Sequence, residues 1–71
     1  MKVWMCIETD RMGDGQEQML FASRNGADAW VKVRMACRPG IWTVVWEEAD
    51  NMAWNCDGFS ALELLEVDVL P

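Results

Sequence analysis

The stretch GADAWVKVRMACRPG, residues 26–40, decides the fold of this chain because its pattern fits either a strand or a helix. As a strand, apolar residues at positions 31, 33 and 35 alternate with basic ones. This reading does not explain Ala27, Ala29 and Trp30, which precede them. As a helix, apolar residues recur at intervals of three and four and form one stripe. That stripe consists of Gly26, Ala29, Trp30, Val33, Ala36 and Cys37. We therefore favour a helix.

Signals at both ends of the stretch support the helix. Either Ser23 or Asn25 can act as the N-cap, whose side-chain oxygen accepts a hydrogen bond from a free backbone N–H group. Asp28 is expected in the first turn, where its negative charge opposes the positive end of the helix dipole. Pro39-Gly40 cannot continue a helix, so the helix is expected to end there.

The helical phase assigns the side chains to two sides. Trp30, Val33 and Cys37 are expected to face the core. The basic residues are expected to face solvent in the C-terminal half of the helix, where positive charge is favourable. They are Lys32, Arg34 and Arg38.

β-Strands are predicted on both sides of this helix. Residues 2–9 place apolar side chains on both faces, as a central strand does. The Gly-Asp-Gly sequence at residues 13–15 predicts a hairpin turn that leads to an edge strand at residues 16–23. After the helix, the predicted strands are residues 40–48 and 52–56.

The last segment fits two structures. Ser60 and Glu63 have the spacing of a capping box, which begins a helix. From Leu65 onward, apolar residues alternate with acidic ones, which is the periodicity of a strand. We favour a strand over residues 63–70 that follows one helical turn at residues 60–62, and a helix is the alternative.

These elements predict a single α+β domain over residues 1–71. An antiparallel β-sheet of four to five strands carries one α-helix packed on one face, in the order ββαββ(β). The other face of the sheet would expose tryptophans unless the strands curl over one another, and an exposed apolar patch usually marks an interface. The tryptophans that could form this patch are Trp4, Trp42, Trp46 and Trp54.

Charge is distributed unevenly along the chain, whose net charge is -6. Residues 24–40 hold four basic side chains and one acidic, whereas residues 41–71 hold seven acidic side chains and no basic one. This acidic surface either keeps the protein dispersed and its strand edges unpaired, or binds a basic protein surface with an aromatic anchor. The candidate partner-binding residues are Glu47, Glu48, Asp50, Trp54, Asp57, Glu63, Glu66 and Asp68.

The residue inventory argues against catalysis, metals and cofactors. The chain contains no His and no Tyr, so a Ser or Cys nucleophile has only carboxylates as a base. Its three cysteines lie far apart, which predicts neither a zinc site nor a complete disulfide framework. The acidic residues around the 13–15 turn lack the spacing of a calcium loop. We therefore expect no enzyme, no catalytic residue, no metal and no cofactor.

Location and nucleic-acid binding follow from the same composition. No apolar run approaches the roughly 18 residues that span a bilayer, and the N-terminal sequence lacks a signal-peptide pattern. We expect no membrane contact and a cytoplasmic location, in the host cell if the protein is phage-encoded. Direct nucleic-acid binding through Arg34 and Arg38 is disfavoured because the remaining acidic charge would repel a polyanion.

The ββαββ layout, the acidic last third and the length of the chain resemble those of small phage-encoded inhibitors of host defence, in particular the anti-CRISPR type. This resemblance implies a protein that binds a CRISPR effector subunit and blocks target DNA or subunit assembly without catalysis. The resulting hypothesis is a small acidic, non-catalytic protein-binding inhibitor. The alternative is a self-associating structural or accessory module of a phage or bacterium, a homodimer that uses a Trp-rich sheet face.

Overall fold

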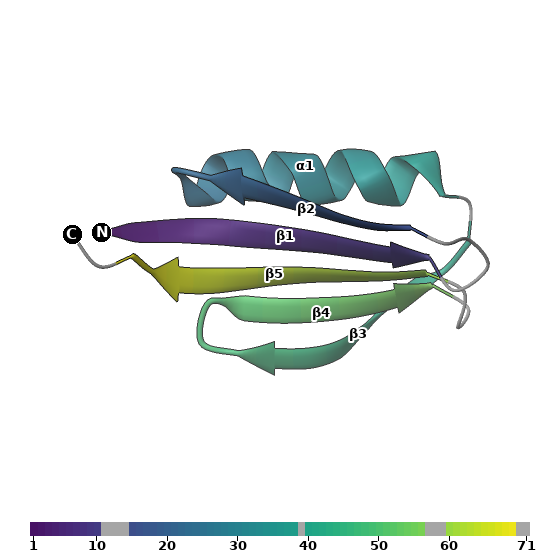
Figure 1. Ribbon diagram of the computed structural model, residues 1–71. Coiled ribbons are helices and arrows are strands. Elements are labelled where there is room, and N and C mark those ends of the chain that lie inside the picture. The colour runs from purple at the N-terminus through teal and green to yellow at the C-terminus, as the bar shows by residue number, and fades with distance from the viewer. Residues whose placement is uncertain (11–14, 39, 57–59, 70–71) are drawn as a thin grey trace.

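The computed structural model describes residues 1–10, 15–38, 40–56 and 60–69. Within them, one helix, α1 (Arg24–Cys37), lies on one face of a five-stranded antiparallel sheet (Figure 1). This arrangement confirms the predicted α+β class. The strands are β1 (Lys2–Asp10), β2 (Gln16–Phe21), β3 (Trp42–Glu48), β4 (Asn51–Cys56) and β5 (Ser60–Asp68), in the spatial order β2-β1-β5-β4-β3.

The first two strands begin where their sequences predict, but β2 ends at Phe21, two residues before its predicted end. β1 is central, between β2 and β5, and it pairs with β2 as a hairpin whose edge strand is β2. Residues 13 and 14 of the predicted turn lie outside the described residues.

The last strand begins earlier than its sequence predicts. The helical turn expected at residues 60–62 is wrong, because β5 already pairs with both of its neighbours at Ser60, which lies opposite Asp10 and Cys56. Leu62 and Leu64 then face the same side of the sheet and are fully buried. Burial of every second residue is the pattern of a strand. Residues 60–64 therefore form a strand, although Ser60 and Glu63 have the spacing of a capping box.

The start of α1 has the predicted cap. The Ser23 hydroxyl accepts a hydrogen bond from the Gly26 N–H at 3.1 Å, so the helix begins at Arg24. Asp28 therefore lies beyond the first turn, contrary to the prediction, and its carboxylate pairs with the Arg24 guanidinium one turn earlier at 3.1 Å.

The helix is rotated relative to its predicted phase. Ala27 and Val31 are buried, whereas Val33 is 60% exposed and Cys37 is exposed. The small Ala27 permits close approach to β1, where the Cys6 Sγ lies 3.8 Å from the Ala27 carbonyl oxygen.

The predicted outward orientation of Arg34 and Arg38 is also wrong. Both guanidinium groups pair with carboxylates of β1, and Arg34 pairs with one of β2 as well. These ion pairs explain the rotation, because they require the arginines to flank the sheet instead of facing solvent. Lys32, by contrast, is exposed as predicted.

The core lies between α1 and the side of the sheet that it covers. Cys6 lies opposite Leu64, and Leu64 lies opposite Met52, so three adjacent strands contribute to the same layer. Burying each leucine side chain contributes about 1.5–3 kcal/mol. Partly buried aromatic and Met side chains surround this layer: Trp4, Phe21, Trp30, Met35, Trp42 and Trp54.

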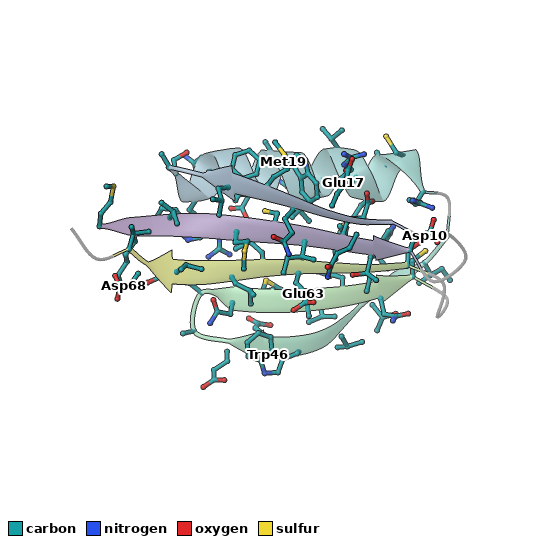
Figure 2. The ribbon with its side chains drawn as sticks, in the orientation of Figure 1. Asp10, Glu17, Met19, Trp46, Glu63 and Asp68 are labelled. Carbon is teal, nitrogen blue, oxygen red and sulfur yellow. The ribbon has the colours of Figure 1, made fainter. Side chains whose placement is uncertain are left out.

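The opposite side of the sheet, called here the open face, is not rich in tryptophan. Trp4, Trp42 and Trp54 share the helix side with the core, as the strand register shows. A β-bulge in β3 shifts the register between Val44 and Trp46, and this shift turns Trp46 to the open face (Figure 2).

Candidate functional site

Acidic residues gather at one end of the molecule. There, the β3–β4 turn, the C-terminal end of β5 and the N-terminus lie close together (Figure 1). The Asn51 side-chain oxygen accepts a hydrogen bond from the Glu66 backbone N–H at 2.7 Å and so ties the turn to β5. We call this region the acidic end and define it by Glu47, Glu48, Asp50, Glu66 and Asp68.

Two basic residues neutralise part of the acidic end. The Lys2 Nζ lies 2.6 Å from Glu66 Oε1, and this hydrogen bond lowers the pKa of Glu66 and raises that of Lys2. The Arg24 Nη1 donates to the Asp50 carbonyl oxygen at 2.9 Å and lies 3.7 Å from the Asp50 carboxylate. Arg24 thereby connects α1 to the β3–β4 turn.

The acidic end keeps exposed carboxylates after this pairing. Glu47, Glu48 and Asp68 are exposed, and the described residues contain no salt bridge to any of the three. The two glutamates are consecutive on an edge strand, so their side chains alternate between the helix side and the open face. A partner that approaches this edge could therefore reach both carboxylates.

Two of the eight predicted partner-binding residues, Trp54 and Glu63, do not join the acidic end. Trp54 lies on the helix side and packs against the core cluster. Glu63 lies on the open face, opposite Ile7 and Ala53, and is half-buried. Asp57 lies outside the described residues. The other five come together because the β3–β4 hairpin folds back beside the end of β5.

A second charged cluster, which sequence analysis missed, occupies the opposite end of the helix. A pocket of about 270 Å³ is lined by charged groups of β1, β2 and α1 together with one glycine. We call it the arginine cluster. Its lining residues are Glu8, Asp10, Gly15, Glu17, Arg34 and Arg38.

Ion pairs hold the arginine cluster together. Arg38 Nη1 lies 3.2 Å from Asp10 Oδ2, and Arg34 forms an ion pair with Glu17. Glu8 is only 7% exposed, and its carboxylate lies 3.8 Å from Arg34 and 3.9 Å from Arg38. Two guanidinium groups thus flank one buried carboxylate, which is the arrangement that a buried acid requires.

The arginine cluster also bears on nucleic-acid binding. Arg34 stacks over the Trp30 ring at 5.0 Å from its centroid while it pairs with two carboxylates. Arg38 pairs with two carboxylates as well. A phosphate would have to compete with these acids for both guanidinium groups. The signal for this pairing was present in the sequence, since Glu8 follows the inward-facing Trp4 and Cys6 at the same two-residue spacing.

The three cysteines differ in their exposure to solvent. Cys6 and Cys56 are buried, Cys37 is exposed and none of the three forms a disulfide. Burial raises the pKa of the Cys6 thiol to about 11. The described residues contain no cluster of His, Cys, Asp and Glu able to hold a metal ion. They also form no helix with the length and apolarity of a membrane span.

No family model matches the chain, and no curated protein or solved structure matches it. The surface of the molecule is therefore the basis for inferring what it binds.

Proposed function

We propose that this chain is a small, non-catalytic protein-binding inhibitor whose acidic end holds a basic surface of a partner protein. The exposure of Glu47 and Glu48 at the outer strand carries the proposal. Neither carboxylate forms a salt bridge within the described residues, so neither would have to leave an internal partner before it binds. Binding there would replace water with Lys or Arg side chains at little cost to the fold.

The pairing of the basic residues supports this proposal. Lys2, Arg24, Arg34 and Arg38 all form ion pairs with acidic residues of the same chain. These positive charges are neutralised by nearby acids. The excess negative charge, -6 in total, therefore lies mainly on carboxylates that have no such basic partner. Negative potential concentrated at one end steers a basic partner toward that end and speeds the encounter.

The resemblance to anti-CRISPR inhibitors suggests the kind of partner. A CRISPR effector holds nucleic acid in a positively charged channel. Carboxylates placed beside the lysines and arginines of such a channel would compete with phosphates for them. We propose that the partner is an effector subunit and that inhibition results from this competition.

The test is affinity for a panel of purified CRISPR effector complexes, measured with two charge-matched double variants. E47Q/E48Q and Q16K/Q18K both change the net charge from -6 to -4. Gln16 and Gln18 are exposed on β2, at the other edge of the sheet. We expect E47Q/E48Q to bind an effector about tenfold more weakly at low salt, because two exposed ion pairs are lost, and Q16K/Q18K to bind like the wild type.

Two outcomes would contradict the proposal. Equal weakening by both variants would mean that net charge alone drives binding and that the acidic end is not the site. Absence of binding to every effector by the wild-type chain, at low salt, would remove the CRISPR partner.

A further inference from the structure

β3 is an outer strand with an unusually apolar edge. It has one neighbour, β4 (Figure 1). All its residues from Thr43 to Glu48 are exposed. No charged residue occurs between Ile41 and Trp46. Large apolar side chains on this segment are 74% exposed at Ile41, 61% at Val45, 46% at Val44 and 41% at Trp46.

The other edge of the sheet differs. β2 begins with Gln16, Glu17 and Gln18, and α1 packs against it. An ion pair between Glu17 and Arg34 joins that edge to the helix. Sheet edges are normally blunted by charge, proline or a covering element, because unpaired backbone N–H and C=O groups attract another strand. β2 has two of these protections, the charge of Glu17 and the covering helix α1.

β3 has less protection. Its charged residues, Glu47 and Glu48, stand only at its C-terminal end. The β-bulge after Val44 also hinders edge pairing, but the segment from Trp42 to Val44 keeps a regular register with β4 and remains free to pair on its outer side.

We propose that β3 pairs with β3 of a second copy of this chain, antiparallel about a two-fold axis, so that two five-stranded sheets join edge to edge. Charge selects this arrangement. Parallel pairing would set Glu47 beside Glu47 and Glu48 beside Glu48, which is unfavourable. An antiparallel register centred on Val44 instead sets Glu47 opposite Ile41 and Val45 opposite Thr43, so that no two charged side chains lie opposite each other. The segment is thus complementary to itself, as a two-fold interface requires.

Edge pairing fits better than stacking the two open faces. The open face carries Glu63, which would be buried with its counterpart at such an interface. Near the centre of the open face, little apolar surface remains to be buried by a partner, because Ile7 is only 8% exposed. Along the β3 segment, by contrast, four large apolar side chains between residues 41 and 46 are exposed.

The dimer should be weak. Pairing of one strand buries less than the roughly 800 Å² per partner that is typical of a stable interface. We expect a reversible monomer–dimer equilibrium in the micromolar range or above, visible as an apparent mass that rises with concentration.

The test is sedimentation velocity from low micromolar to near-millimolar concentration, with four lysine variants. V45K and I41K place a charge on the edge of β3, and V33K is the matched control, since Val33 on α1 is 60% exposed and Val45 is 61% exposed. L20K places a charge on the open face, where Leu20 is 66% exposed. Circular dichroism verifies that each variant is folded.

We expect the wild-type chain, V33K and L20K to move from one chain toward two as the concentration rises, and V45K and I41K to stay monomeric. A wild-type chain that remains monomeric throughout would overturn the proposal. So would a dimer that survives in both V45K and I41K. Loss of the dimer in L20K alone would assign it to the open face instead.

Amide hydrogen exchange adds a readout that a general loss of solubility would not mimic. Residues 42–45 should exchange more slowly at high concentration than at low concentration in the wild-type chain, but not in V45K. Neutralising Glu47 and Glu48 should leave the dimer intact or strengthen it. Failure of the dimer and failure of the proposed partner binding are therefore separately visible.

Discussion

At the scale of single residues, the three cysteines occupy different environments. Cys6 lies beneath α1 with no exposed surface, and burial raises the pKa of its thiol to about 11. Cys37, at the end of the helix, is exposed. Since the thiolate is the reactive form, both burial and the raised pKa protect Cys6 from reaction.

We expect an alkylating reagent near pH 8 to modify Cys37 first. About a thousandth of the Cys6 thiols would be ionised at that pH, so Cys6 should react only after unfolding. Mass spectrometry of the timed reaction should show one fast modification in the wild-type chain and none in C37A. A fast modification that persists in C37A would mean that the core opens around Cys6 or Cys56.

The Lys2–Glu66 pair predicts a pH dependence at the acidic end. The hydrogen bond from Lys2 lowers the pKa of Glu66 in the folded chain, so this pair contributes stability above the ordinary pKa of a glutamate. That contribution is lost as the pH falls through the lowered pKa. Solvent screens the pair, so the effect is small.

Thermal unfolding of E66Q and of a matched control, E47Q, measures this effect. Between about pH 7 and about pH 3, E66Q should lose less stability than the wild-type chain, whereas E47Q should follow the wild type. Identical pH profiles for all three proteins would show that the ion pair does not contribute in solution.

At the scale of the elements, α1 shows where pattern and structure diverge. Its sequence contains two candidate apolar sides, and the larger one includes Trp30, Val33 and Cys37. The structure buries Ala27 and Val31 and packs Trp30 against the core, whereas Val33 and Cys37 are exposed. An apolar stripe assumes that charged residues face solvent, but the helix places arginines beside the sheet, where carboxylates of other elements meet them.

Alanine substitutions at Val31 and Val33 measure the phase of the helix directly. V31A should lower the free energy of unfolding by about 2 kcal/mol, because it leaves a cavity beneath a residue that is 4% exposed. V33A should change it by less than about 0.5 kcal/mol, since this side chain is mostly in water. Urea denaturation gives both values. A larger loss of stability in V33A than in V31A would instead support the helix orientation that the apolar stripe predicts.

The strands were more predictable than the helix orientation. Alternation in residues 2–9 and 40–48 predicts β1 and β3, because the two-residue period assigns each side chain to one face. The start of β5 was not predicted, because the spacing of Ser60 and Glu63 imitates a capping box. Tertiary pairing with β1 and β4 overrides that local signal.

At the scale of the whole molecule, the fold determines which charged residues lie close together. The sequence places seven acidic residues and no basic one after position 40, but it does not show which of them meet. Strand alternation moves Glu63 to the open face, and the β3–β4 hairpin brings Glu47 and Glu48 to the end of β5. Arg24 at the start of α1 and Arg38 just past its end then pair with acids at the two ends of the helix.

This sorting gives the molecule two contact surfaces, which adjoin at Glu47 and Glu48 on β3. The acidic end is suited to a basic partner, and the edge of β3 is suited to a second copy of the chain. In an antiparallel dimer, the two acidic ends would lie at opposite ends of the joined sheet. Such a dimer could hold two copies of a partner.

The central claim is that the acidic end is the binding site, and hydrogen exchange on the complex with an effector tests it most directly. The complex must be compared with the free chain at the same chain concentration, so that self-association contributes equally. We predict slower exchange at residues 47–51 and 66–68 and unchanged exchange in α1. Protection confined to α1, or to β1 and β2, would contradict the account.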